Sequence, residues 1–435
     1  MCPGLRTERA VRITIVAWGG QGDVRPYMAL GKGFKEAGHA VRMAAPERYE
    51  TLVRDLGLDY QRIGGDVDEV IRRQDLQAAM EKSSSVAALA SAMRAIPPLI
   101  RQWMADGQAA CHDCEVVVGG FLPMFFIGPC LAEKNGVPFI PGYLQPFTPT
   151  REFPSFGLFT GPNLGAALNR LTHVTTAQLL WQVYRRAVNS ARREVLGLGP
   201  APFRGYFGAH CRLRRPILYG FSPHVLPKPA DWGESDHITG CWYLEPPAGW
   251  TPPADLVAFL RAGPPPVSIG FGSMASRDPE GMAKLTAEAL ALSGQRGVLL
   301  SGLGDVHMAD LPDSIFMTDS VPHRWLFPQM AAVVHHGGSG TTGAGCWAGV
   351  PSIVVPHNFD QPFWGQRLAR LGVGPPPVFR SNLTAERLAE AITVSVTDEA
   401  MRHRAAELGE KIRAEDGVSR AVEIVERVCS DPPSA

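Results

Sequence analysis

One short plan occurs twice in this chain: a β-branched run, a glycine turn, a helix-like stretch and a second β-branched run. It first spans residues 13–45 and returns in residues 267–300. A strand, a crossover helix and a second parallel strand form a unit that is covered on both faces. Helix and strand patterns continue to alternate after both copies. This alternation predicts an α/β fold with two doubly wound parallel-sheet domains that face each other across a cleft.

A proline-rich stretch, residues 223–266, separates the two copies. Such a stretch suits a stiff linker, here flanking a short strand at residues 237–242. We therefore predict a first domain over residues 1–225, a linker with a strand over residues 226–266, a second domain over residues 267–415 and a C-terminal helix over residues 416–435. That last helix is expected to pack back on the first domain.

The overall composition excludes several classes of protein. The 435 residues carry 42 Lys and Arg against 42 Asp and Glu, so the chain lacks the basic excess typical of a nucleic-acid-binding protein. Eight cysteines are few for this length and suit reduced thiols, which predicts a cytoplasmic protein. We find no signal-peptide pattern, and uncharged runs fall short of the ~20 apolar residues that a membrane span needs.

Residues 151–230 depart from this neutral balance. They contain ten Arg and one Lys against two Glu, and they include Phe153 and Phe156 ahead of a helix-like stretch at residues 164–196. A solvated helix face with a neighbouring loop is the simpler interpretation. The alternative is a weak peripheral contact with an anionic membrane surface, or with an acidic ligand.

The strongest local signal follows the paired His335 and His336, where residues 337–345 consist of Gly, Ser, Thr and Ala. A buried strand that runs through glycines into a helix start exposes backbone amides, and the helix dipole favours an anion there. We expect a diphosphate to bind this turn, held by Gly338, Ser339, Gly340 and Thr341.

Three alternatives to a diphosphate site are weaker. Close helix packing alone would explain the glycines but not the hydroxyl side chains. A metal site is disfavoured because adjacent histidines on a strand point to opposite faces. The hydrolase pattern Gly-x-Ser-x-Gly is broken because Thr341 stands at the position of its last glycine.

Neighbouring loops supply further candidates for a sugar nucleotide. After the next strand, Asp360 and Gln361 pair a carboxylate with an amide, which suits sugar hydroxyls; capping of the following helix by Asp360 is compatible with binding. Gly272 and Ser273 form another glycine turn at a strand end that points to the same diphosphate. The backbone of Val321 is a candidate for holding a nucleobase.

The first glycine turn, residues 19–26, does not match the dinucleotide fingerprint, because Arg25 stands where its third glycine should be. What remains is Asp23, a lone carboxylate on a loop that faces the cleft. It is a candidate general base, and helix capping is an equally good explanation.

Cys111 and Cys114 have the spacing of a redox or zinc pair. No second cysteine pair accompanies them, so we interpret these thiols as structural.

Taken together, these motifs resemble the family 1 nucleotide-sugar glycosyltransferases of the GT-B fold. Residues 321–374, with His-His-Gly-Gly-Ser-Gly-Thr-Thr-Gly-Ala-Gly and Asp-Gln-Pro-Phe-Trp, are similar to the donor motif of bacterial and fungal sterol glucosyltransferases and of antibiotic glycosyltransferases that act on macrolides or glycopeptides. The opening Gly-Gly-Gln-Gly-Asp-Val-Arg-Pro is similar to their acceptor domain. The resemblance implies that residues 1–225 bind the acceptor and residues 267–415 bind the nucleotide sugar.

The resemblance also implies roles for residues. His336 would contact the diphosphate, and Asp23 would be the catalytic base. The expected reaction is inverting transfer of a hexose from UDP-glucose or a dTDP-sugar to a hydroxyl of a sterol, a macrolide or another apolar acceptor. No cofactor and no metal are expected, and the protein would be a monomer or a homodimer. The expected acceptor-side residues are Gly22, Phe121, Phe126 and Phe147.

Two other functions stay open at this stage. A two-domain protein of this kind could bind a nucleotide sugar without turnover. An NAD-linked enzyme built on the first domain is the weaker alternative.

Overall fold

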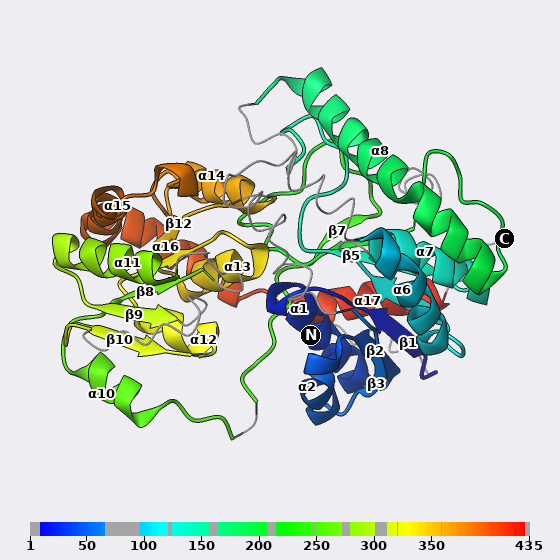
Figure 1. Cartoon of the computed structure of the whole chain (residues 1–435), viewed down its shortest axis with the longest axis horizontal. Coiled ribbons are helices and arrows are strands. Elements are labelled where there is room, and N and C mark those ends of the chain that lie inside the picture. The colour runs from blue at the N-terminus through cyan, green and yellow to red at the C-terminus, as the bar shows by residue number, and fades with distance from the viewer. Residues whose placement is uncertain are drawn as a thin grey trace.

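The computed structural model describes residues 9–65, 96–120, 124–156, 163–206, 215–247, 249–271, 279–300, 311–319, 321–357 and 359–430. Within these ranges the chain forms two lobes, each with a parallel sheet between layers of helices (Figure 1). The predicted α/β class with two doubly wound domains is confirmed. None of the helices in the described ranges is both long enough and apolar enough to cross a membrane.

The N-terminal sheet has the strand order β3-β2-β1-β4-β5-β6-β7. Its central strand β1 pairs on both sides, with Ile13 opposite Val41 on one neighbour and opposite Val116 on the other. The central strands β1 and β4 are short and rich in buried β-branched residues because both faces of the sheet are covered, whereas the edge strand β3 is only partly buried. The strands are β1 (Arg12–Val16), β2 (Ala40–Ala45), β3 (Asp59–Arg62), β4 (Val116–Gly119), β5 (Phe139–Tyr143), β6 (Ile217–Tyr219) and β7 (Asp236–Ile238).

Helices cover both faces of this sheet, and the long α8 lies along its outer side (Figure 1). Trp181 and Tyr184 of α8 are buried in a hydrophobic cluster with Trp103 of α6 and Phe126 of α7. These contacts fix α8 on the domain. The helices of this domain are α1 (Gln21–Glu36), α2 (Glu50–Asp55), α6 (Pro97–Ala110), α7 (Met124–Asn135) and α8 (Ala166–Ala191), and a π-helical turn (Arg192–Leu196) continues α8.

The C-terminal sheet has the order β10-β9-β8-β11-β12 and places β11 beside β8. Both of these strands end at the same edge, with His335 opposite Gly270. Its strands are β8 (Val267–Gly270), β9 (Gly297–Leu300), β10 (Ile315–Thr318), β11 (Ala332–His335) and β12 (Ser352–Val354). Its helices are α10 (Ala254–Arg261), α11 (Pro279–Ser293), α12 (His323–Leu326), α13 (Ser339–Ala348), α14 (Gln361–Leu371), α15 (Ala385–Thr397) and α16 (Glu399–Arg413).

The strand predicted at residues 237–242 is shorter in the structure. It lies at Asp236–Ile238 as β7, and Gly240 follows with φ of +109°, a backbone conformation that ends an extended strand. Trp242 leaves the sheet but stays buried, since its ring packs over Gly142 and Gly220, where a Cβ would come within 3.0 Å of it.

The last described helix, α17 (Gly417–Ser430), follows the C-terminal domain in sequence but packs on α1 of the N-terminal domain (Figure 1). Ala421 and Val422 join the same buried cluster as Leu30 and Phe34. Gly33 allows this approach, because a Cβ there would lie 2.2 Å from Val418 Cγ1.

The chain therefore passes between the domains twice, and the two passages touch. A Cβ placed on Gly417, in the second passage, would lie 2.6 Å from the carbonyl oxygen of Cys241 in the first. Ser222 Oγ also donates a hydrogen bond to Glu415 Oε1 at 2.6 Å.

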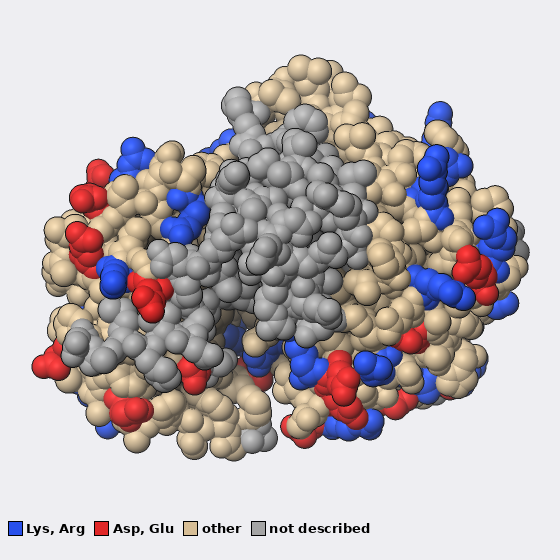
Figure 2. Space-filling view, viewed as in Figure 1, with Lys and Arg blue, Asp and Glu red and all other residues tan. Residues whose placement is uncertain are grey.

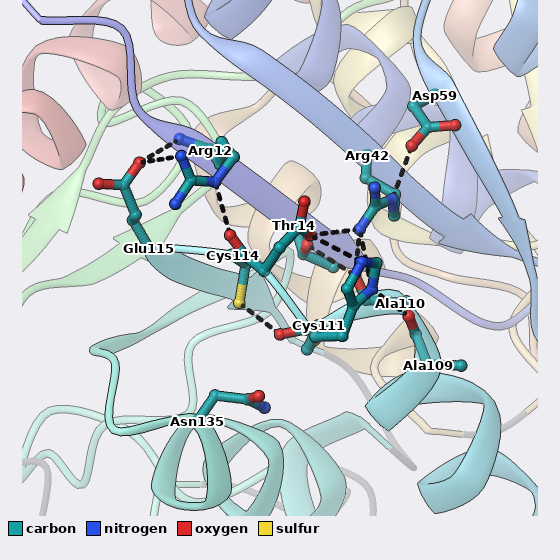
Figure 3. Close-up of polar contacts among 12 residues, drawn as sticks. Arg12, Thr14, Arg42, Asp59, Ala109, Ala110, Cys111, Cys114, Glu115 and Asn135 are labelled. Carbon is teal, nitrogen blue, oxygen red and sulfur yellow. Dashed lines mark hydrogen bonds and ion pairs between the residues drawn. The ribbon is translucent and has the colours of Figure 1, made fainter.

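Cys111 and Cys114 lie at the amino-terminal edge of the N-terminal sheet, just before β4 (Figure 3). Both are buried free thiols, and Cys114 Sγ donates to the carbonyl oxygen of Cys111 at 3.3 Å. Nearby, the Arg42 guanidinium donates to Asp59 Oδ2 and to Asp113 Oδ1, both at 2.6 Å. This edge lies opposite the carboxyl ends of the strands, and the arrangement supports a structural role for the two cysteines.

Candidate active site

The glycine turn after β11 has the geometry of an anion site. Gly337 has φ of +91°, and a Cβ there would lie 2.6 Å from Val354 Cγ1, so only glycine fits. Gly338 is the N-cap of α13 and has no side chain to bond the first amides. The first intrahelical bond runs from Thr342 N to Gly338 O at 2.9 Å. The amides of Ser339, Gly340 and Thr341 therefore have no acceptor within the helix.

The two histidines beside this turn differ in their roles. His335 Nδ1 accepts a hydrogen bond from Gly337 N at 3.0 Å and so shapes the turn. Burial lowers the pKa of His335 to about 3 and that of His336 to about 4, so both rings are neutral at physiological pH. His336 Nδ1 is buried without a partner in the described part of the chain, and a Cβ on Gly338 would lie 2.5 Å from His336 Nε2. His336 thus stands directly against the start of α13.

Asp360 is buried at the start of α14 and does not cap that helix with its side chain. Its Oδ2 atom instead accepts from Trp364 Nε1 at 3.0 Å and from Gln145 Nε2 at 3.2 Å. The preceding residue, Phe359, has φ of +55°. In the described ranges it is the only non-glycine residue with a positive φ. Such backbone strain is found mostly at functional sites. Burial raises the pKa of Asp360 to about 6.

Gln361 is buried next to Asp360 and shapes the same loop. Its Oε1 atom accepts a hydrogen bond from His357 N at 2.8 Å.

Asp23 lies in the first turn of α1, which corrects the prediction that it stands on a loop before a helix starting near residue 27. The helix begins at Gln21 and contains Pro26 in its second turn, where proline has a helical φ but no N–H to bond the carbonyl of Gly22. Asp23 Oδ2 accepts from Gly20 N, the N-cap amide, at 2.9 Å. Asp23 is thus the third helical residue and satisfies the amide of the N-cap residue.

The environment of Asp23 makes it a stronger base than an ordinary aspartate. Burial raises its pKa to about 6; the hydrogen bond from Gly20 opposes this rise, and the nearby Asp360 carboxylate adds to it. Arg48 donates to the carbonyl oxygen of Gly19 at 2.8 Å and so holds the turn that leads into α1. A carboxylate with such a pKa is still mostly ionised at neutral pH.

The two domains bring these groups together. A Cβ on Gly340 would lie 3.9 Å from Gly22 Cα, so the first turns of α13 and α1 face each other. Gln145, in the loop after β5, reaches across the interface to Asp360. Asp23, Asp360 and the start of α13 therefore form one polar site between the domains.

Two of the aromatic residues predicted for the acceptor site lie in different parts of the N-terminal domain. Phe147 lies in an aromatic group at the domain interface, 4.9 Å from Tyr143 and 5.0 Å from Phe156 between ring centroids, and Phe156 also contacts Phe363 of α14. Phe126 lies instead in the core, against Trp181 and Tyr184 of α8. The expectation that Phe126 lines the acceptor pocket has no support from this position, because its ring is 2% exposed.

The structure says less about the remaining residues that were predicted to bind the nucleotide sugar. The side chain of Val321 is buried against Leu326 and Phe327, which leaves only its backbone for a ligand. Gly272, Ser273 and Phe121 lie outside the described residues. Among the described residues, no three His, Cys, Asp or Glu side chains are grouped so that they could hold a metal ion.

The sequence interpretation missed Gln145, Trp364 and Arg48. Gln145 follows a buried strand at the carboxyl edge of a parallel sheet, and that position was the available signal. Trp364 follows Asp360 by four residues, one helical turn, and that spacing was the available signal for its hydrogen bond to Asp360. Nothing in the local sequence indicates that Arg48 donates to Gly19.

Comparisons with known proteins cover most of the chain. Residues 13–154 match the model of the glycosyltransferase family 28 N-terminal domain, and residues 300–429 match that of the erythromycin biosynthesis protein CIII-like C-terminal domain. The sterol 3-beta-glucosyltransferase UGT80B1 of Arabidopsis thaliana is 33% identical over 433 residues, which cover 97% of this chain and 69% of that protein. The sterol 3-beta-glucosyltransferase of Cryptococcus neoformans is 34% identical, and this chain spans only 27% of its length.

Solved structures share the fold. The kitacinnamycin glycotransferase has a TM-score of 0.66 at 21% identity, covering 97% of this chain and 99% of its own. The glycosyltransferase VinC, solved in complex with dTDP, has a TM-score of 0.66 at 19% identity, covering 96% and 99%. The two-sheet architecture, the glycine turn before α13 and these relatives agree, and the chain belongs to the GT-B glycosyltransferases, in the group that includes the sterol 3-beta-glucosyltransferases.

Proposed function

We propose that this chain transfers a hexose, with inversion, from a nucleotide diphosphate sugar to a hydroxyl group of an apolar acceptor. The observation that carries the proposal is the meeting of Asp23 with Asp360 at the start of α13, where the Ser339 amide bonds Asp360 and the amides of Gly340 and Thr341 have no acceptor within the helix. One carboxylate belongs to each domain, so one lies beside each of the two proposed substrate sites. The sterol-specific names of the relatives make a sterol the first acceptor to test, with macrolides and other natural products next.

On the donor side, residues 267–415 would hold the nucleotide sugar. The amides and hydroxyls of residues 338–341 would bind the diphosphate, together with His336 and the turn at Gly272 and Ser273. A neutral imidazole donates one N–H, and buried donors of this kind stabilise developing negative charge. Asp360 and Gln361 would accept from and donate to the sugar hydroxyls, and the backbone of Val321 would meet the base.

On the acceptor side, residues 1–225 would place the acceptor hydroxyl against Asp23. The carboxylate takes the hydroxyl proton while the oxygen attacks the anomeric carbon. The bond from that carbon to the diphosphate breaks on the opposite side, and the diphosphate leaves with the electron pair. One such displacement inverts the configuration. In this scheme α13 and His336 stabilise the leaving group, and no metal ion takes part.

Product formation tests the proposal directly. The full chain is incubated with UDP-glucose or dTDP-glucose and a panel of sterols and macrolides, while free nucleotide diphosphate and glycosylated product are measured by mass spectrometry. We expect release of one nucleotide diphosphate per product, at a rate unaffected by a chelator. Tight nucleotide-sugar binding with no product from any acceptor would instead favour the non-catalytic alternative.

A further inference from the structure

Most of the exposed large apolar side chains in the described ranges lie on one helix or next to it. In the described ranges nine large hydrophobic residues are exposed, and six of them lie on α8, just before it or against it. Phe203, whose carbonyl oxygen accepts from Trp181 and Gln182 of α8, is 66% exposed. We define the α8 face as these six residues: Leu164, Leu168, Leu171, Val174, Leu179 and Phe203.

The opposite side of α8 is already used. Trp181, Tyr184 and Val188 are buried in the core of the N-terminal domain. The exposed side chains therefore contribute nothing to the packing of this domain, and an apolar surface of this kind marks an interaction site.

The charge along α8 specifies the partner. The sequence of α8 contains three arginines and no Asp or Glu. Arg185 lies over the Phe203 ring, 4.7 Å from its centroid, and Arg186 and Arg193 are exposed. Arg185, Arg186 and Arg193 form no ion pair with a described residue. The remaining arginine of α8, Arg170, lies 3.8 Å from Asp231, and Glu194 is paired with Arg101. In Figure 2 the upper edge of the molecule, where α8 begins in Figure 1, is uncharged, and blue side chains gather further along the helix.

Apolar side chains beside unpaired arginines suit the boundary of an anionic lipid bilayer. The leucines enter the edge of the hydrocarbon region, while the guanidinium groups stay with the lipid phosphates. We propose that the α8 face docks the protein on an anionic membrane surface.

The position of α8 connects this surface to the site. Ser155 N donates to Thr172 Oγ1 of α8 at 2.8 Å, and Phe153 contacts both His173 of α8, at 5.9 Å, and Phe363 of α14, at 5.2 Å. The membrane-facing helix is thus joined through one short aromatic segment to the interface that holds Phe147. A bilayer-dissolved acceptor would enter from this side; this last step alone depends on the proposed transferase function.

Vesicle flotation tests the docking without any substrate. The full chain is mixed with two kinds of vesicle. One contains phosphatidylcholine alone, and the other contains in addition ~30% phosphatidylglycerol, which makes its surface anionic. We expect binding to the anionic vesicles that weakens as salt is added. The Leu168→Ser/Leu171→Ser double variant should bind about tenfold more weakly or worse. The matched control Leu292→Ser/Val394→Ser changes two exposed residues of the other domain and should bind like the wild type.

A second pair of variants isolates the charge. Arg186→Gln/Arg193→Gln should lose several-fold in binding to anionic vesicles, whereas Arg261→Gln/Arg402→Gln, also exposed, should not. Wild-type protein that ignores anionic vesicles would overturn the proposal. So would a wild-type dimer, seen by sedimentation, that Leu168→Ser/Leu171→Ser converts to monomer, since the face would then join two copies.

The failure of docking and the failure of catalysis remain distinguishable. If the chain is a transferase that docks, Leu168→Ser/Leu171→Ser should slow transfer to a sterol held in vesicles and leave transfer to the same sterol delivered by cyclodextrin unchanged. Absence of transfer in both formats would contradict the proposed function and leave the flotation result to decide the docking.

Discussion

The two sides of the candidate site are built in different ways. The C-terminal side depends on one continuous segment, His335–Thr341 in sequence order, which presents backbone amides and glycine conformations to the proposed ligand. The N-terminal side gathers side chains that are far apart in sequence, namely Asp23, Arg48, Gln145 and Phe147. A site built from consecutive backbone groups can be predicted from a short sequence motif. A site built from side chains that are far apart in sequence can be identified only in the folded structure.

The largest expected effect comes from the N-terminal side. Asp23→Asn keeps the shape of the side chain but removes the base, and general-base assistance is typically worth roughly 10²–10⁴ in rate. We expect kcat to fall by about this factor, while calorimetry finds the affinity for the bare nucleotide diphosphate unchanged. Glu36→Gln, an exposed charge on the same helix, is the control. A wild-type rate in Asp23→Asn would remove this residue from the mechanism.

A change on the C-terminal side is expected to weaken the binding of the nucleotide diphosphate. Gly337→Ala forces a Cβ into the space 2.6 Å from Val354 Cγ1 and onto a backbone with positive φ. Distortion of the turn should weaken nucleotide diphosphate binding by roughly tenfold to a hundredfold. Gly294→Ala, at φ of +65° but with open space, controls for the backbone conformation alone. If both variants bind equally well, the turn is not the diphosphate site.

Gln145 lies where the two sides meet, and its loss should give a smaller effect. Gln145→Leu removes one donor from Asp360 Oδ2, an effect worth about tenfold in the KM for the nucleotide sugar. The Kd of the bare nucleotide diphosphate, which has no sugar, should stay constant. Trp364→Phe removes the other donor from within the C-terminal domain and should act in the same direction. A changed Kd for the bare diphosphate would mean that Asp360 acts on the diphosphate part of the nucleotide sugar and not on its sugar.

The pH profile sharpens the comparison because the Asp360 carboxylate adds to the rise that burial causes in the pKa of Asp23. Wild-type kcat/KM should rise as pH increases through about 6, the pKa of both Asp23 and Asp360. In Asp360→Asn the repulsion that raises the pKa of Asp23 is gone, so the rise should move to lower pH by roughly half a unit. An unmoved profile would show that the two groups do not interact.

The last expected effect concerns stability and not activity. Burial raises the pKa of Asp23 from 3.8 to about 6, so the folded chain holds this proton more tightly than the unfolded chain does. The resulting stabilisation is complete below pH 3.8 and is lost as pH rises through 6. Asp23→Asn should therefore unfold with a free energy up to about 3 kcal/mol higher than wild type at pH 8. Urea unfolding followed by Trp fluorescence should show this gain disappearing near pH 4.

The local geometry of the C-terminal side of the candidate site could be predicted from sequence better than that of the N-terminal side, for a physical reason. Glycines at 337 and 338 and hydroxyls at 339 and 341 act through local backbone geometry, so their order alone indicates the turn and the helix start. The same holds for the two sheets, whose buried β-branched strands alternate with helices.

Local patterns failed where tertiary contacts decide. Residues 19–26 were expected to form a glycine turn with Asp23 on a loop, but α1 starts at Gln21 and Asp23 bonds the Gly20 amide. Phe126 was expected in a pocket and lies in the core, because its side chain packs against α8, which is more than 40 residues away in sequence. The bridge from Gln145 to Asp360 spans 215 residues, and no motif describes such a pair.

The position of α17 has a consequence for how this protein comes apart. The C-terminal domain carries, at its far end, a piece of the other domain's interior, so a single cut between the domains does not free them. A protease acting within residues 246–253 should produce two fragments that stay associated and co-elute, because separation would strip Ala421 and Val422 from their apolar partners. For the same reason, expressing the two lobes separately would expose to solvent the apolar surface between α1 and α17.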